Sequence, residues 1–525
     1  MPSVSVRSQD VGDGGTRRGL QERHLSMMAL AGMIGTGLFL SSGKALAQAG
    51  PLGCVLGFIL MGTVTASIAY SSAEMSAFKP VGGGFVRHAN IWMDKSTGIA
   101  IGWNFWYSMA ITMPTEISAA TALVNFWTPS LSHAVPISCL WLLIAIINFS
   151  PVRVYGEFEF YFAFCKIALI ITFIITGIVL DAGGLPGQER IGFRYWQDPY
   201  PLFREYIKTG PYGRFLGFWS TLISATFAYG NVQVVAIAGA ETRNPRKSIP
   251  SALKKTFTRV ILFYVVSVFV ISLTVPANDE RLNAPGDISR SPFVIAFTRV
   301  GIKALPSIIN AIVFTSAFSS GNACTFLASR TLHGLALDGH APSVFLKLNR
   351  YQVPYVAVTA SVVWGGIAYA SLNRSAYQAF SWLVSLVTTS GIISWVIIGI
   401  TYIRFFRALK VQGIQREFLP YKSPFQPYIT YYALVMNLLV LIFSGWNAFS
   451  PRFDGSLFAS NYLNCFIYPV LYFALKMWLK DEIIPLHDID FESEFTAIKA
   501  EEERDDYSHD DFRGTYYNRI LNALF

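Results

Sequence analysis

Apolar segments long enough to cross a lipid bilayer recur along almost the whole chain. A membrane-spanning helix needs about 20 mostly apolar residues. Backbone amides and carbonyls find no partners in hydrocarbon, so only helices and closed barrels can span a membrane. Twelve segments are apolar and of suitable length, at residues 25–47, 52–78, 96–127, 134–150, 155–180, 215–240, 257–276, 303–333, 354–372, 376–406, 428–449 and 456–479. The sequence therefore predicts an all-α integral membrane protein with 12 transmembrane helices.

The composition and the ends of the chain agree with this prediction. Charged residues make up 14% of the 525 residues, whereas a soluble domain is about one quarter charged. Residues 1–24 are polar and lack the apolar core and cleavage site of a secretory signal peptide. Lys and Arg are more frequent in the segments that would share a side with the N-terminus, so we expect both termini in the cytosol. We divide the chain into an N-terminal tail (1–24), a transmembrane domain (25–479) and a C-terminal tail (480–525).

The C-terminal tail is acidic while the rest of the chain is basic. Residues 480–525 hold 13 acidic and 5 basic residues, a net charge of −8, which leaves +17 for the remainder. Basic loops of a membrane protein are typical of its cytosolic side, and nucleic acid is not an expected partner. The tail has two interpretations: it docks on a basic inner loop near Arg243, Arg246 and Lys247, or it is solvated and disordered.

The first apolar segment carries an unusual cluster of glycines at its centre. Gly32, Gly35 and Gly37 lie within six residues, and each Gly costs a helix about 1 kcal/mol relative to Ala. Backbone that leaves the helix at membrane depth is tolerated only inside protein or beside a water-filled cavity. The freed amides of a half-helix can then receive an anion such as a carboxylate. The alternative is a continuous helix in close contact with a neighbour, which also favours Gly.

The sixth apolar segment repeats this irregularity. Its centre reads Phe227-Ala228-Tyr229-Gly230-Asn231, with Gly and Asn at positions where a helix favours neither. Interrupted first and sixth spans are typical of a five-plus-five inverted repeat, in which two discontinuous helices form one site near the midplane. The prediction is therefore a 5+5 repeat with helices 11 and 12 outside it.

Charged residues deep in a span indicate function, because they are rare and costly there. Glu116 follows Ser108 and Thr112 at intervals of four residues, so the three line one helix face. This carboxylate can serve a proton or a substrate ammonium; the alternative is a buried structural acid bonded to hydroxyls. Lys166, in the fifth span, is too far from either end to reach water comfortably. It is a candidate proton site or fixed cation, or else it caps backbone carbonyls of the broken first span.

Other polar residues of the spans carry less information. Glu74 lies near the end of the second span, where acids are often interfacial, and Ser316, Ser319 and Ser320 are expected to hydrogen-bond across helices. The five cysteines show no metal-like spacing, and no catalytic constellation is evident. We therefore expect no metal, no cofactor and no enzymatic activity.

Six segments together resemble the fungal amino-acid permeases, the yeast amino acid transporter family of the amino acid–polyamine–organocation superfamily. The resemblance covers about residues 20–480. The matching segments are Arg23-His24-Leu25 through Gly37-Leu38-Phe39, Pro114-Thr115-Glu116, Gly156-Glu157-Phe158-Glu159-Phe160 with Lys166, Glu241-Thr242-Arg243-Asn244-Pro245-Arg246, Ser316 through Asn322, and Ala328-Ser329-Arg330.

The resemblance implies proton-coupled uptake of L-amino acids at the plasma membrane by alternating access. The family's carboxylate site corresponds to Gly35, Thr36 and Gly37, and its ammonium site to the carbonyls around Phe227, Ala228 and Tyr229. With the flanking Ile34 and Gly230 and the helix face of Ser108 and Thr112, these are the candidate substrate-binding residues. Glu116 and Lys166 are the candidate proton-coupling residues.

Two features depart from the family pattern. Many members carry a glutamate shortly after the break of the sixth span, where this chain has Gln233. The N-terminal tail has no lysine, although members are commonly ubiquitinated there, so Lys480 and Lys499 become the candidate sites for ubiquitin-ligase adaptors.

The resulting functional prediction is an H⁺/L-amino-acid symporter of broad neutral specificity. Its expected partners are a small-molecule L-amino acid, protons and the lipid bilayer. The alternatives are a transporter of a related amine (choline, a polyamine or 4-aminobutyrate) and a non-transporting amino-acid sensor of the same fold.

Overall fold

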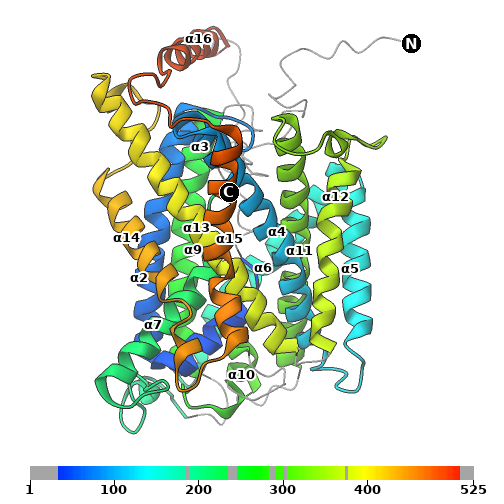
Figure 1. The fold of residues 1–525 in the computed structure, drawn as a ribbon. Helices are drawn as coiled ribbons and strands as arrows, with labels where there is room; N and C mark the ends of the chain where they lie inside the picture. Colours follow the sequence, from blue (N-terminus) through cyan, green and yellow to red (C-terminus); the bar gives the residue numbers. More distant parts are fainter. Residues whose placement is uncertain are drawn as a thin grey trace.

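The computed structural model describes residues 34–184, 189–234, 245–282, 291–298, 304–372 and 376–508. In these ranges every regular element is a helix, and the long helices run along one common direction as a bundle (Figure 1). They are α2 (Ser42–Phe78), α4 (Lys95–Val124), α5 (Ala134–Phe149), α6 (Val152–Asp181), α7 (Gly210–Ala228), α9 (Pro245–Thr274), α11 (Leu305–Leu337), α12 (Tyr355–Val362), α13 (Ala376–Val411), α14 (Tyr428–Ile442) and α15 (Gly455–Leu479). Shorter helices are α3 (Phe85–Trp92), α10 (Pro292–Thr298) and α16 (Glu492–Ser508).

These helices agree with the apolar segments of the sequence to within a few residues at most of their ends. Within the described ranges, 7 helices are long and apolar enough to cross a membrane. One of them is α12 together with the 3₁₀ turns of Val363–Leu372 that continue it. The chain is thus a multi-pass helical membrane protein, while the number of 12 crossings stays a prediction.

The first two predicted spans meet end to end at Gly50. This residue interrupts α2 with φ of 79°, and Pro51 follows it. A side chain here would also collide with the chain, because a Cβ on Gly50 would lie 2.7 Å from the carbonyl oxygen of Leu202. A positive φ and a close backbone contact both require glycine. The boundary predicted between residues 47 and 52 is therefore confirmed.

Both irregular spans leave the regular α-helix. In the first, Ile34 and Gly35 are bends and a π-helical segment, Gly37–Ser41, leads into α2. In the sixth, α7 ends at Ala228, and the chain turns through Asn231, whose φ is 67°. The predicted segment 215–240 is thus helical only in its first half as far as it is described. Residues 25–33 and 235–244 lie outside the described part.

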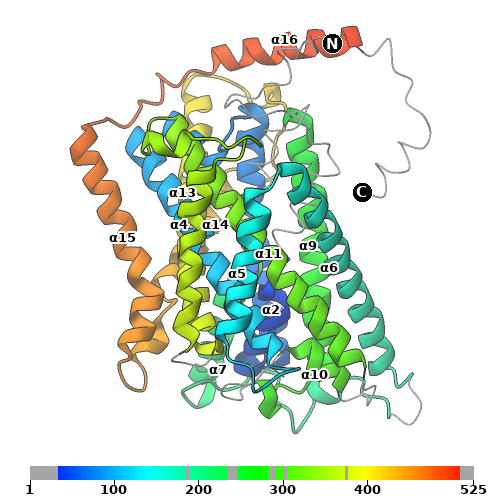
Figure 2. The ribbon, with the colours of Figure 1, turned by 90° about the vertical axis from the view of Figure 1, so that its right-hand side faces the viewer.

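The core of the bundle lies between α2, α4, α11 and α13. Along much of its length α11 packs against α4, while α2 packs against α7 and α9. By contrast, only 6% of the most apolar window of α15 is buried, compared with 67% in the helix that includes α2. Figure 2 shows α15 at the edge of the bundle, so its apolar side chains face the surroundings of the protein.

The segment that follows α15 crosses the end of the bundle where α3 lies (Figure 1). We call residues 481–498 the C-terminal strap. The Ile484 amide donates to the carbonyl of Met93 at 2.9 Å, and Asp481 accepts a hydrogen bond from the Ser96 amide at 2.7 Å. Farther along, Phe491 is 1% exposed and packs on Phe78. The strap is therefore part of the folded body and not a free tail.

The strap also contacts the first turn of α9 and the end of α2. Nη2 of Arg246 lies 2.7 Å from Oε1 of Glu494, and Nζ of Lys79 lies 3.5 Å from Oε2 of the same carboxylate. Docking of the acidic C-terminal segment near Arg246 was one of the two interpretations of the sequence, and the structure agrees with it here. Arg243 and residues 509–525 lie outside the described part.

Candidate functional site

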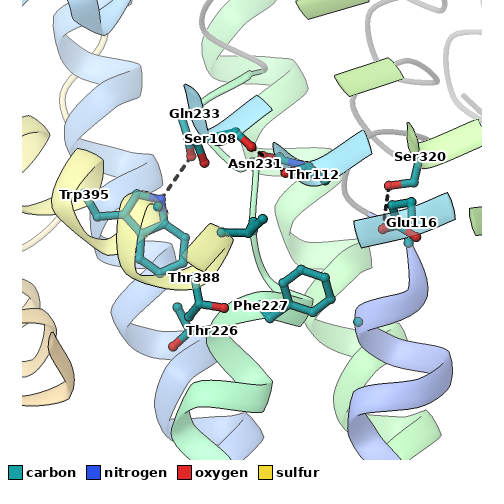
Figure 3. Close-up of a pocket in the computed structure, with 15 residues that line it drawn as sticks. Ser108, Thr112, Glu116, Thr226, Phe227, Asn231, Gln233, Ser320, Thr388 and Trp395 are labelled. Atoms are coloured by element: carbon teal, nitrogen blue, oxygen red, sulfur yellow. Dashed lines mark hydrogen bonds between the residues drawn. The ribbon is translucent and has the colours of Figure 1, made fainter. Parts of the chain in front are cut away.

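The two broken spans border a cavity inside the bundle (Figure 3). The space between its atoms, including open solvent at its mouth, is about 540 Å³. Its walls come from the first span, α4, the end of α7 and the turn after it, α11 and α13. The lining residues are Gly35, Gly37, Ser108, Thr112, Glu116, Thr226, Phe227, Gly230, Asn231, Gln233, Ser320, Val387, Thr388, Gly391 and Trp395.

Glycine is needed in the first break because other atoms occupy the position of a side chain. A Cβ on Gly35 would lie 2.8 Å from Oε1 of Glu116 and 2.9 Å from Oγ of Ser320. A Cβ on Gly37 would lie 2.6 Å from the Cα of Ala228, at the end of α7. The two breaks are therefore in direct contact, as the sequence predicted.

The polar face of α4 borders the cavity as its spacing predicted. Ser108, Thr112 and Glu116 all lie in the wall, and each is at most 3% exposed. The Thr112 hydroxyl donates to the backbone carbonyl of Ser108 at 2.7 Å. Ser320 of α11 donates to Oε1 of Glu116 at 3.0 Å, so one of the predicted cross-helix serine contacts holds this acid. The carboxylate is thus fixed at the cavity wall by a neighbouring helix.

The second oxygen of Glu116 is buried without a hydrogen-bond partner in the described part of the chain. The Thr36 side chain interacts with this carboxylate, but its hydroxyl lies outside hydrogen-bond geometry and also lacks a partner. A buried polar atom without a partner is costly. The arrangement therefore leaves acceptor capacity on Glu116 and donor capacity on Thr36 next to the cavity.

Four of the predicted substrate-binding residues do not line the cavity. Ile34 and Thr36 are the chain neighbours of Gly35 but are not part of the lining. The carbonyl of Ile34 accepts a hydrogen bond from Ser316 at 3.4 Å. Ala228 packs against Gly37, and the ring of Tyr229 stacks on Tyr264 with centroids 5.1 Å apart. Phe227 and Gly230 do line the cavity, although the Phe227 carbonyl already accepts the Gly230 amide at 3.2 Å.

Sequence reasoning missed Thr388 and Trp395 in the opposite wall of the cavity, and it noted Gln233 only as a departure from the family pattern. Figure 3 shows Gln233 and Trp395 on the side away from Glu116, with Phe227 between the two sides. Nε1 of Trp395 donates to Oε1 of Gln233 at 3.0 Å, and both side chains are buried. Thr388 and Trp395 belong to an apolar helix, α13, whose sequence has no charge or break near them to single them out.

Lys166 is buried at 1% exposure in α6 but does not line the cavity. Its charge interacts with two buried carboxylates, Glu159 on the same helix and Glu116 on α4. Glu159 was not predicted as a site residue. The signal available was its position seven residues before Lys166, which places both on one side of a helix.

Glu74 and the cysteines have structural surroundings. Glu74 is fully buried and accepts two hydrogen bonds from Arg416, at 3.0 and 2.7 Å, so it is a paired acid inside the protein. The five cysteines are unpaired thiols, and no group of His, Cys, Asp and Glu suited to a metal is found in the described ranges.

The sequence of the chain matches a known family over most of its length. The profile of the family described as "Amino acid permease" covers residues 24–487. The chain belongs to the amino acid permease family.

Curated fungal permeases are similar to it over nearly their whole length. A lysine-specific permease of Saccharomyces cerevisiae is 37% identical over 93% of this chain and 80% of the relative. A basic amino-acid permease of the same yeast is 36% identical over 92% and 85%. A proline-specific permease of Emericella nidulans is 38% identical over 89% and 86%.

Membership of the family decides the class of function. This permease is a multi-pass membrane transporter of amino acids and not an enzyme. The resemblance recognised from the six sequence segments is thus confirmed. The cavity between the two broken spans is the candidate site for the amino acid.

Proposed function

We propose that this permease imports L-amino acids with protons, by alternating access at the plasma membrane, with both termini in the cytosol. One observation carries the proposal: a cavity bordered by both helix breaks holds a buried carboxylate, Glu116, one oxygen of which has no partner in the part of the chain that the structure describes. Freed backbone groups of half-helices suit the two charged ends of an amino acid. A carboxylate shielded from water can bind the coupling proton.

Neutral side chains are the favoured substrates within this proposal. Gln233 accepts the Trp395 N–H through its carbonyl oxygen, which leaves the NH₂ group of its amide as a donor for the cavity wall. A donor at this position suits a neutral side chain or one that accepts hydrogen bonds, and it disfavours an ammonium or guanidinium. Glu116 is already bonded to Ser320 on the other side.

A second candidate is transport of basic amino acids. The relatives named as lysine-specific and basic permeases favour it, and Glu116 is a carboxylate that a cationic side chain can approach. Choline, polyamine or 4-aminobutyrate transport and a sensor without transport are the more distant alternatives. Each predicts a different substrate preference or no uptake.

The test is uptake of labelled substrates into proteoliposomes, with and without an inward proton gradient. The panel contains neutral amino acids, proline, lysine, arginine, choline, putrescine and 4-aminobutyrate. The proposal expects gradient-driven uptake of neutral L-amino acids and its loss in Glu116→Gln and Lys166→Ala. Equal uptake with and without the gradient would contradict proton coupling, and binding without uptake would indicate the sensor.

The role of Gln233 has its own test. Gln233→Glu adds a carboxylate to the cavity while keeping an acceptor for Trp395. We expect the ratio of lysine to neutral uptake to rise about tenfold, which corresponds to about 1.4 kcal/mol of differential binding. An unchanged ratio would show that the Gln233 side chain does not set the preference.

Regulation by ubiquitin-ligase adaptors is proposed at the C-terminal segment. Lys480 and Lys499 are both exposed, at the start of the strap and on α16. Replacing both with Arg keeps the charge and removes the acceptor amines. We expect the variant to be retained at the cell surface after excess substrate is added, as measured by surface labelling.

A further inference from the structure

A second buried acid lies on α6, outside the lining of the cavity. Glu159 is 1% exposed, and its Oε1 accepts a hydrogen bond from the Ser319 hydroxyl at 2.7 Å. Its Oε2 is buried without a hydrogen-bond partner in the described part of the chain. The Asn322 amide faces it outside hydrogen-bond geometry, while the Asn322 carbonyl accepts from Asn148 at 2.9 Å. The site thus holds one carboxylate oxygen firmly and leaves the other for a proton.

The two buried acids are held by consecutive residues of one helix. Ser319 donates to Glu159 on α6, and Ser320 donates to Glu116 on α4. Each acid also keeps one buried oxygen that has no hydrogen-bond partner among the described residues. The two carboxylates are therefore equivalent in their local chemistry, although only Glu116 lines the cavity.

Lys166 connects the two acids electrostatically. It follows Glu159 by seven residues, or about two helical turns, and its charge interacts with both carboxylates. With all three groups ionised the cluster carries a net charge of −1, and one added proton makes it neutral. A buried net charge is costly, so the closed site favours the form with one carboxyl protonated.

We propose that Glu159 is a proton-carrying residue of the transport cycle, sharing one coupling proton with Glu116 in the field of the Lys166 charge. The proposal rests on the proposed symport function and deepens it. Glu116 receives the proton at the cavity and gives it up as Glu159 takes one, while the positive charge of Lys166 favours whichever carboxylate is ionised. One O–H bond breaks at Glu116, one forms at Glu159, and Lys166 remains an ammonium.

Other titratable groups around the cluster are few in the described ranges. Tyr155 of α6 and Cys324 of α11 interact with Glu159, and Tyr264 of α9 interacts with Glu116. Arg330 of α11 acts on Tyr155. Cys324 also receives a weak contact from the Asn231 amide at 3.8 Å. These groups are neutral at physiological pH or lie beyond the acids, so the two carboxylates and Lys166 are the groups suited to proton exchange.

The test separates proton movement from substrate movement in proteoliposomes. Glu159→Gln keeps the size and an acceptor for Ser319 but cannot carry the proton. We expect gradient-driven accumulation and substrate-dependent acidification of the vesicle lumen, read with a pH-sensitive dye, to be lost. Exchange of internal for external substrate, which needs no net proton transfer, is expected to persist. Glu157→Gln, two residues away on the exposed side of α6, is the matched control and should retain all three activities.

The outcomes are distinguishable. Equal uptake by the wild type with and without the proton gradient would overturn the symport proposal itself. Gradient-driven wild-type uptake with an unchanged Glu159→Gln variant would overturn only the role of Glu159. Loss of exchange together with accumulation, in a variant that still elutes as a folded protein, would also overturn it.

A second variant keeps the proposal testable if Glu159→Gln does not fold. Ser319→Ala removes the hydrogen bond that favours the ionised carboxylate of Glu159, so we expect the pH midpoint of uptake to move to higher pH. Ser319→Thr keeps the hydroxyl and should restore the midpoint. A midpoint that is the same in Ser319→Ala and wild type would contradict proton exchange at Glu159.

Discussion

Gly37 leaves no space for a side chain at the contact between the two broken spans. Its Cβ would lie 2.6 Å from the Cα of Ala228, a backbone atom that no rotamer change can move. We expect Gly37→Ala to separate the breaks and to abolish uptake, measured in proteoliposomes. Gly391→Ala is the matched control, because Gly391 also lines the cavity but a Cβ there meets no atom within 4 Å. Comparable uptake by the two variants would show that contact between the breaks is not required.

His88 of α3 makes the stability of the fold depend on pH. Burial lowers the pKa of His88 to about 4, and its Nε2 lies 2.8 Å from the carbonyl oxygen of Lys79, to which it donates. The ring stacks on Trp92, and Nδ1 has no partner in the described part. Because the neutral form is favoured by folding, stability is full above the ordinary pKa of about 6.5 and falls as the pH drops toward 4.

Acidification is expected to lower the free energy of unfolding by at most about 3 kcal/mol through His88. This loss is measured as the thermal midpoint of the detergent-purified permease between about pH 7 and pH 5. His88→Gln cannot take up the proton, so its midpoint should fall less than that of the wild type over this interval. Parallel pH profiles would exclude His88 as a source of the acid sensitivity.

Among residues, those that interrupt an apolar pattern were predictable and those that do not were missed. Gly35, Gly37 and Glu116 are conspicuous in apolar segments, and all three line the cavity. Thr388 and Trp395 reach it only because α13 packs against α4, a contact between residues nearly 300 positions apart. Single-sequence patterns carry no information about such packing.

The helices were predicted well because the bilayer requires each span to have about the same length and to satisfy its backbone hydrogen bonds within the helix. Helix limits followed from apolar runs, whereas the kink at Gly50 was seen only in the structure. The surroundings of Glu74 were not predictable, since its partner Arg416 lies in a short 3₁₀ helix more than 300 residues farther along the chain.

The contact between Glu74 and Arg416 ties α2 to the segment after α13. Glu74 also accepts the Ser423 amide at 2.9 Å, and it is fully buried. Glu74→Gln removes the negative charge and leaves Arg416 without its counter-ion. Breaking a buried ion pair in this way lowers the free energy of unfolding by about 3–5 kcal/mol. We expect a clear drop of the thermal midpoint in detergent.

Glu417→Gln is the control for this prediction. Glu417 is adjacent to Arg416 but is 62% exposed and pairs only with Lys422 in the described part. An exposed pair contributes at most about 1 kcal/mol. Equal midpoints for the two variants would mean that the buried pair adds nothing to stability.

For the whole molecule, the C-terminal strap connects helices that are distant in the sequence. It forms hydrogen bonds with Met93 and Ser96, its Phe491 packs on Phe78, and its Glu494 forms an ion pair with Arg246. Truncation after Lys480 should expose the apolar surface under Phe491 and lower the thermal midpoint. Truncation after Ala500 retains the strap and should leave the midpoint unchanged.

An equal midpoint for the two truncations would contradict a structural role of the strap. A further check is Glu494→Gln combined with Arg246→Gln. Because the two side chains form one ion pair, the double variant should lose less stability than the sum of the single losses. Additive losses would mean that the pair makes no net contribution.

The consecutive serines of α11 have a consequence for how the bundle can open. Successive residues on a helix point about 100° apart, so Ser319 and Ser320 fasten α11 to two different helices, α6 and α4. Movement of α11 away from α4 releases Glu116, whereas movement away from α6 releases Glu159. Which of the two helix interfaces opens therefore determines which acid becomes exposed to water. If the proposed symport holds, opening of the bundle and the choice of proton donor are one event in this geometry.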